Sequence, residues 1–145
     1  MLKRYYTDLV TEADAPARQA FRFFTRIEDW QDWSSVIAHA RLLGKDWESA
    51  RFLVFMPRLP GVPLPPVPLL VEILHYEPHK QITWGIRLPM ASLQHRFTFV
   101  PVESDRCRIH HEEWSEGVLT LMLWPVGRWI RRFNDRFARE LAGMF

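Results

Sequence analysis

The chain of 145 residues contains a single cysteine, Cys107, and no apolar stretch long enough to cross a membrane. One cysteine excludes an internal disulfide and fits a reducing compartment. The longest uncharged runs, 59–71 and 117–127, are too short for a bilayer and are interrupted by proline. Asp8 and Glu12 break any apolar run near the N-terminus, so we predict no signal peptide there. We therefore expect a cytoplasmic protein without stable membrane insertion.

Neither sign of charge dominates, since 19 Lys and Arg residues stand against 17 Asp and Glu residues, for a net charge of +2. A nucleic-acid-binding protein usually concentrates basic residues on one surface, so we expect no nucleic-acid partner. The sequence also lacks a GxSxG motif and any regularly spaced set of His and Cys ligands. A serine hydrolase therefore has no support, and we predict neither a metal site nor a cofactor.

Aromatic residues, by contrast, are abundant, with seven Trp and ten Phe. Such large and rigid apolar side chains suit a hydrophobic core or the wall of a binding cavity. A chain of this length can bury roughly two-thirds of its unfolded surface, and we find neither a linker nor an internal repeat. We therefore expect a single domain over residues 1–145.

Runs rich in aromatic and β-branched residues predict seven strands separated by turn residues. The predicted strands cover residues 4–11, 36–43, 51–56, 69–76, 81–88, 92–102 and 106–116. Short links imply antiparallel neighbours, because a parallel crossover needs a dozen or more residues. The exception is the segment 57–68, whose six prolines predict a stiff loop between the third and fourth strands. Three interpretations of this loop stay open: a lid, an oligomer contact or a simple insertion.

Two short helices are predicted between the first two strands. Asp14 offers an N-cap for the first helix, and Pro16 suits its first turn, where the missing N–H costs nothing. The second short helix carries Trp30 and Trp33.

The segment from Gly117 to Phe145 has the clearest helical periodicity in the chain. Six apolar residues fall within an arc of roughly 120°: Val126, Trp129, Ile130, Phe133, Phe137 and Leu141. The opposite face is mostly basic and carries Arg128, Arg131, Arg132, Asp135, Arg136 and Arg139. Taken alone, such a helix suits a membrane surface or a partner's groove. An antiparallel sheet with one apolar face needs a cover, however, and we expect this long helix to provide it.

Several local patterns accompany this order of elements. They are Ala15-Pro16-Ala17 before the first helix, Trp30 and Trp33, Ile82-Thr83-Trp84, His95 to Val102, and Glu112 to Gly117. Together they resemble the helix-grip superfamily of START lipid-transfer domains and polyketide cyclases/dehydrases (SRPBCC proteins), over essentially the whole chain. The resemblance implies an α+β fold in which a curved seven-stranded antiparallel sheet wraps around a long C-terminal helix. It also implies an internal cavity for lipids, sterols or polyketides, by analogy of fold alone.

Strand alternation places Ile109, His111 and Glu113 on one face of the last strand, and we expect that face to point inward. His95 occupies a similar position on the strand before it. An inward His–Glu pair beside His95 suits general acid–base chemistry, since histidine titrates near neutral pH. The alternative is that these groups only line a wet cavity or hydrogen-bond to one another. The candidate catalytic residues are thus His111, Glu113 and His95.

The leading hypothesis is a protein that binds an apolar or aromatic small molecule between the sheet and the last helix. The expected ligand-binding residues are Trp30, Trp33, Trp84, His95, Phe97, Phe99, His111, Glu113, Trp129 and Phe133. A second hypothesis is a cyclase or dehydratase that uses His111 and Glu113 as acid–base partners. A third is a surface or assembly module acting through the 57–68 loop and the Arg-rich helix face. A homodimer is compatible with each of these hypotheses.

Overall fold

The computed structural model describes residues 2–58 and 67–145. Seven strands form one antiparallel sheet in the order β1-β7-β6-β5-β4-β3-β2. The strands are β1 (Lys3–Ala13), β2 (Ile37–Leu43), β3 (Phe52–Pro57), β4 (Leu69–Glu77), β5 (Gln81–Leu88), β6 (Ala91–Glu103) and β7 (Arg106–Gly117). Each predicted strand is present with its ends displaced by at most two residues, and the predicted α+β fold is confirmed.

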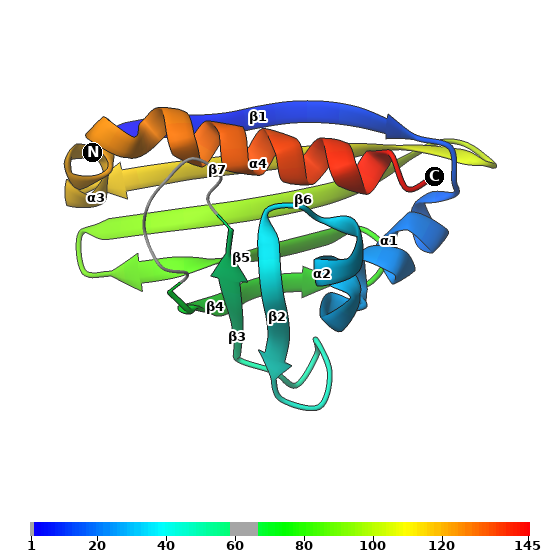
Figure 1. The fold of residues 1–145 in the computed structure, drawn as a ribbon, viewed down its shortest axis with the longest axis horizontal. Coiled ribbons are helices and arrows are strands. Elements are labelled where there is room, and N and C mark those ends of the chain that lie inside the picture. The colour runs from blue at the N-terminus through cyan, green and yellow to red at the C-terminus, as the bar shows by residue number, and fades with distance from the viewer. Residues whose placement is uncertain (1, 59–66) are drawn as a thin grey trace.

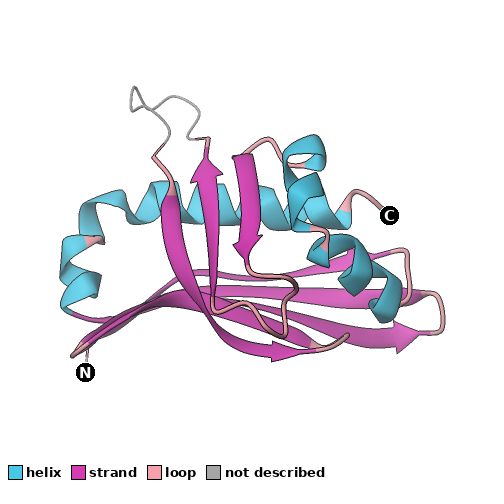
Figure 2. Cartoon of the chain, turned by 90° about the horizontal axis from the view of Figure 1, so that it is seen from below, coloured by secondary structure: helices cyan, strands magenta, loops and turns pink. Residues whose placement is uncertain are grey.

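The sheet is strongly curved around the long helix α4 (Gly127–Ala142). Strands that follow one another in sequence pair with each other from β2 to β7, and β1 joins the far side of β7. The pairing of β1 with β7 shifts between Tyr5 and Thr7, and such bulges bend a strand and increase its twist. Figures 1 and 2 show that β2 and β3 run across the direction of β1, β6 and β7, so the sheet encloses α4.

Three short elements lie between β1 and β2: α1 (Ala17–Thr25), the 3-10 turn η1 (Ile27–Asp29) and α2 (Trp30–Trp33). The two predicted helices are therefore present, but the predicted N-cap is wrong. Pro16 occupies the cap position of α1, and no side chain caps the helix. The exposed carboxylate of Asp14 instead lies 3.3 Å from Arg106 on β7. An ion pair with the sheet thus takes the place of the expected helix cap.

The C-terminal segment forms more than one helix. A short helix, α3 (Val118–Met122), and the 3-10 turn η2 (Trp124–Val126) precede α4. Pro125 lies in η2, where its missing N–H and fixed backbone angle interrupt a continuous helix. In the part of the chain that the structure describes, no helix has the length and apolar character needed to cross a bilayer.

The buried face of α4 differs from the predicted apolar stripe. Its buried residues are Gly127, Asn134, Phe137, Ala138 and Leu141. At 100° per residue, the centre of this arc lies about 70° from the centre of the predicted stripe. Trp129 is consequently 44% exposed, and Ile130 and Phe133 are half-buried. Gly127 leaves room for the guanidinium of Arg4 on β1, which an added Cβ would meet at 2.7 Å, and the small Ala138 is completely buried.

Aromatic side chains from the helices and the sheet fill the core. Phe24 of α1 lies 4.6 Å from Phe97 of β6 between ring centroids, and Trp30 of α2 lies 5.3 Å from Phe137 of α4. This packing joins the short helices, the sheet and α4 into one core. Residues 59–66 of the predicted Pro-rich loop lie outside the described residues, so the interpretations of that loop stay predictions.

Candidate functional site

Two adjacent strands bring a histidine and a glutamate together beneath α4. His95 of β6 lies directly opposite Glu113 of β7 in the antiparallel register. Nε2 of His95 is 2.6 Å from Oε2 of Glu113, and both side chains are buried. The strand alternation predicted this inward orientation for both residues.

The helix α4 closes over this pair through Asn134. Its Nδ2 donates a hydrogen bond to Oε2 of Glu113, and the residue is completely buried. The next residue, Asp135, accepts a hydrogen bond of 3.1 Å from Thr7 of β1. One carboxylate oxygen of Glu113 is thus held by both His95 and Asn134, which connects the helix to the two central strands of the site.

His111 is the third titratable group of the cluster. Its ring stacks on Phe97 with a centroid distance of 4.0 Å, and it meets the ring of His95 edge-on at 5.0 Å. The side chain is completely buried, yet neither ring nitrogen has a hydrogen-bond partner among the described residues. Nδ1 of His95 and Oδ1 of Asn134 also lack such a partner. Four buried polar atoms of this cluster are therefore free to form hydrogen bonds that no described residue supplies.

Burial determines the protonation of this cluster. It raises the pKa of Glu113 well above the ordinary value of 4.5 and lowers the pKa of His95 to about 3. Burial, and to a smaller extent the neighbouring His95, lowers the pKa of His111 well below 6.5. Because the charged form of each group is disfavoured, the stable state is a carboxylic acid that donates its O–H to Nε2 of a neutral His95.

A second chain of buried polar groups continues along the inner face of β7. The hydroxyl of Ser115 lies 2.8 Å from Tyr6 Oη and 2.8 Å from Thr120 Oγ1. Tyr6 sits at the bulge of β1, and Thr120 belongs to α3. The polar part of the interior beneath α4 therefore extends beyond the two histidines and Glu113 to Ser115, Tyr6 and Thr120.

Two of the predicted aromatic residues belong to the cluster. Phe97 stacks on His111, and the ring of Trp84 lies 5.5 Å from the ring of His95. Trp30 packs behind Trp84 at a centroid distance of 5.8 Å. These three aromatic side chains form the apolar wall beside the polar atoms.

The other predicted aromatic residues lie elsewhere. Phe99 packs against α1 at the far end of β6, and Trp33 stacks on Phe137 at 5.1 Å. Phe133 packs against the edge of the core. The prediction that Trp129 faces the sheet was wrong, because the rotation of α4 leaves this residue 44% exposed.

Sequence reasoning missed three polar residues of this interior: Tyr6, Thr120 and Asn134. Asn134 carried a usable signal, because it is the only uncharged polar residue in α4. Its contact with Glu113 was not predictable, since it depends on how far α4 is rotated. Thr120 gave no signal within an otherwise apolar segment.

Two hollows in the described part of the molecule lie away from the cluster. One, of about 460 Å³, is lined by residues of α1 and by Phe145. The other, of about 530 Å³, lies along the outer side of α4 and is lined by Arg132, Asp135, Arg136, Arg139 and Glu140. Neither hollow includes His95, His111 or Glu113, and all three of these residues are buried.

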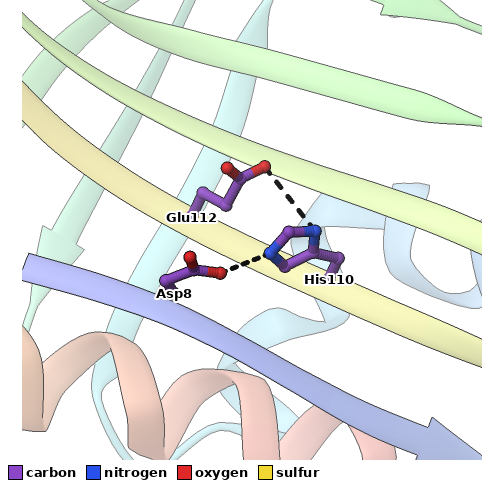
Figure 3. Close-up of side chains that lie close together, drawn as sticks. All are labelled: Asp8, His110 and Glu112. Carbon is purple, nitrogen blue, oxygen red and sulfur yellow. Dashed lines mark hydrogen bonds and ion pairs between the residues drawn. The ribbon is translucent and has the colours of Figure 1, made fainter. Parts of the chain in front are cut away.

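A separate group of titratable residues lies on the outer face of the sheet (Figure 3). Nε2 of His110 is 2.5 Å from Oδ1 of Asp8, and its Nδ1 is 3.8 Å from Glu112. Arg96 also donates two hydrogen bonds to Glu112, at 2.9 and 3.0 Å. Each nitrogen of His110 faces a different carboxylate, and Glu112 is already held by a guanidinium. We therefore interpret these residues as an ion-pair network rather than a metal site.

The chain matches the sequence model of a known protein family and shares its fold with several solved structures. The sequence model of a family described as "Polyketide cyclase / dehydrase and lipid transport" matches residues 7–143. A search of curated protein sequences found no match.

Several solved structures share the fold. A START superfamily protein from Mycobacterium smegmatis has a TM-score of 0.75 and 16% identity, covering 95% of this chain and 94% of its own. Major latex-like protein 151 from Panax ginseng has a TM-score of 0.74 and 10% identity, with 99% and 98% covered. The Zhui aromatase/cyclase from a Streptomyces species has a TM-score of 0.72 and 11% identity, with 99% and 93% covered. At these identities the likeness establishes the helix-grip fold.

Proposed function

Because the chain belongs to the polyketide cyclase/dehydrase and lipid-transport family, we propose that it binds an apolar or aromatic small molecule between its sheet and α4. The cluster of His95, His111, Glu113 and Asn134 holds the polar end of that ligand. The binding unit is the single domain over residues 1–145.

The observation that supports this proposal is the set of four buried polar atoms that have no hydrogen-bond partner among the described residues. Buried polar groups in folded proteins are nearly always hydrogen-bonded, because leaving one unpaired costs roughly 1–3 kcal/mol. Ligand sites combine a mostly apolar wall with a few convergent polar groups. Both ring nitrogens of His111 and Nδ1 of His95 fit a hydroxyl or carbonyl group that arrives with a ligand.

The apolar part of the ligand contacts the aromatic wall and the half-buried side of α4. Trp84 and Phe97 flank the histidines, and Ile130 and Phe133 are incompletely covered on the helix. Each methylene group that a ligand buries there contributes about 0.8 kcal/mol. Because His95, His111 and Glu113 are buried, we propose that a ligand reaches them by displacing half-buried residues of α4 such as Phe133.

A thermal-shift panel of fatty acids, sterols and aromatic polyketides tests the proposal. A ligand present at one hundred times its Kd should stabilise the fold by about 2.7 kcal/mol. His111→Gln should weaken the binding of that ligand at least tenfold, because the substitution removes the imidazole ring and its two buried nitrogens. The matched control is His110→Gln, since the adjacent side chain points to the outer face. The proposal fails if no compound raises the melting temperature, or if both variants weaken binding equally.

A second function is favoured by one specific feature, the buried neutral pair of Glu113 and His95. In a cyclase or dehydratase, neutral His111 would remove a proton from the carbon next to a ketone; its lowered pKa makes it a weak base, which is why this function ranks second. Glu113 would donate a proton to the departing hydroxyl, which leaves as water, or to the alkoxide formed in ring closure. A carboxyl group with a raised pKa is suited to this role of general acid.

The two functions separate in one pair of measurements on a β-hydroxy ketone substrate. Glu113→Gln preserves the shape of the side chain, and its amide oxygen can still accept from Asn134, but it has no acidic proton to donate to His95 or to a substrate. If the protein is an enzyme, this variant should lose turnover by at least about a hundredfold while the Kd changes little. Equal losses in binding and turnover would support simple binding and exclude the acid–base role.

A further inference from the structure

The helix α3 is amphipathic in the reverse sense to an ordinary surface helix. Its one polar residue, Thr120, is completely buried and hydrogen-bonds to Ser115. Leu121 and Met122 are instead 64% and 68% exposed. A short helix that turns its hydroxyl inward and its largest apolar side chains outward leaves apolar surface without a partner in the described structure.

This apolar surface continues onto neighbouring elements, and we name the whole surface the α3 tip. Its exposed members are Leu88, Met90, Val118, Leu121, Met122, Trp124 and Trp129. Met90 lies in the turn between β5 and β6, and the adjacent Ala91 pairs with Gly117 just before α3. Figure 1 places α3, this turn and the start of β1 at the same end of the molecule. The apolar residues are thus gathered at one end of the sheet.

The α3 tip is held rigidly to the sheet. The guanidinium of Arg4 on β1 lies 4.2 Å from the ring of Trp124 and donates a hydrogen bond of 3.3 Å to its backbone carbonyl. The amide of Gly117 donates to the carbonyl of Leu2 at 2.7 Å. These contacts present the exposed side chains on a fixed frame.

Beside the α3 tip lie three arginines without an ion-pair partner among the described residues. Arg128, Arg131 and Arg132 are exposed on the first turns of α4, and none forms an ion pair with any described residue. The acidic Glu116 nearby is 3.8 Å from Lys3. A second copy of the chain would bring two such clusters of Arg together, and like charges across an interface oppose association. Anionic phosphate groups complement them.

We propose that the α3 tip docks the protein reversibly on an anionic phospholipid bilayer. Leu121, Met122 and Trp124 enter the boundary between headgroups and acyl chains, and the three Arg residues contact lipid phosphates. The tip is too small to span the membrane, so this docking is peripheral. It uses no residue of the buried cluster and therefore stands or falls independently of the proposed ligand.

Vesicle flotation with the full chain tests this docking. Vesicles of phosphatidylcholine with phosphatidylglycerol should bind the protein at low salt, and vesicles of phosphatidylcholine alone should not. Leu121→Ser with Met122→Ser, and separately Arg128→Gln with Arg131→Gln and Arg132→Gln, should each reduce partitioning by about tenfold or more. High salt should weaken binding of the parent protein, because it screens the Arg contribution.

Matched controls lie at distant sites. Val100→Ser with Val102→Ser removes exposed apolar side chains at the opposite end of β6, and Arg18→Gln with Arg22→Gln and Arg41→Gln removes the same charge elsewhere. Both controls should partition within about twofold of the parent. Absent binding at low salt, or equal losses in the controls, would overturn the proposal. So would a concentration-dependent dimer in sedimentation that the Leu121 and Met122 changes abolish, because a second copy would then occupy the tip.

Discussion

His95 and Glu113 face each other across β6 and β7, and their buried side chains meet at 2.6 Å beneath α4. The same oxygen of Glu113 accepts a hydrogen bond from Asn134 of α4. This contact joins the sheet and the helix through three polar groups, in addition to the apolar packing of Phe97 on Phe137. Its stability depends on protonation, because burial disfavours the charge on each titratable partner.

The first prediction concerns Glu113→Gln and the dependence of stability on pH. The pKa of Glu113 is raised in the folded state above its ordinary value of 4.5, so the folded state holds this proton more tightly. Stability from this group is therefore complete below about 4.5 and is lost as pH rises toward the raised pKa. Glutamine has no proton to lose. In urea unfolding between about pH 5 and 8, the free energy of unfolding of the variant should increase relative to that of the parent as the pH rises.

Glu103→Gln makes the same chemical change at the exposed end of β6 and serves as the control. If it altered the pH dependence as much as Glu113→Gln does, the effect would not come from the buried pair. If Glu113→Gln left the pH dependence unchanged, the carboxyl group would be ionised in the folded protein.

The second prediction concerns His111→Leu. Leucine removes two buried nitrogens that have no partner among the described residues, at the cost of the stacking on Phe97. The net change in the free energy of unfolding at neutral pH should be a gain of about 1 kcal/mol. The lowered pKa of His111 also means that its contribution is complete above about 6.5 and is lost as pH falls. The variant should therefore lose less stability in acid than the parent.

His110→Leu is the control on the same strand, since that side chain interacts with Asp8 on the outer face. Chemical denaturation at neutral and acidic pH checks both variants. A loss of stability in His111→Leu as large as in His110→Leu would mean that the ring of His111 is satisfied in the folded protein.

The sheet could be predicted from the sequence because period-two patterns and turn residues act locally. All seven strands were located, and the inward faces of His95, His111 and Glu113 followed from alternation alone. The register that sets His95 against Glu113 was not predicted, because a bulge between Pro101 and Glu103 shifts the pairing of β6 and β7 beside their turn. The orientation of the three side chains was therefore accessible from the sequence, but their exact pairing was not.

The contribution of α4 to the site could not be predicted from the sequence in the same way. The apolar periodicity of α4 is dominated by large side chains, whereas the helix buries its smaller face at Gly127 and Ala138. The helix buries the face with Gly127 and Ala138 and leaves Trp129 exposed. The periodicity of apolar residues alone does not predict which of these two faces is buried. As a consequence Asn134, which completes the cluster, was missed and Trp129 was misplaced.

The third prediction concerns Gly117→Ala at the junction of β7 and α3. Gly117 has a φ of 71°, a region that side chains with a Cβ rarely adopt, and an added Cβ would collide with the carbonyl oxygen of Met90. We expect a loss of about 2 kcal/mol or more in the free energy of unfolding. Gly143→Ala is the matched control, because its nearest contact is 3.3 Å away and its φ is −69°. Equal thermal stability of the two variants would show that the chain relaxes around residue 117.

The fourth prediction concerns Glu140, whose carboxylate is the far anchor of α4. Its two oxygens accept hydrogen bonds of 3.0 and 3.1 Å from the backbone N–H of Ser35, just before β2. Hydrogen bonds to charged groups contribute roughly 1.5–3 kcal/mol, so Glu140→Ala should lower the free energy of unfolding by about that amount. Glu140→Gln should recover part of the loss, because its amide oxygen still accepts. Arg139→Ala, an exposed change one residue away, should cost less than about 0.5 kcal/mol. Hydrogen exchange at the Ser35 amide gives the direct readout, since faster exchange in Glu140→Ala but not in Arg139→Ala requires that this bond holds the helix to the sheet.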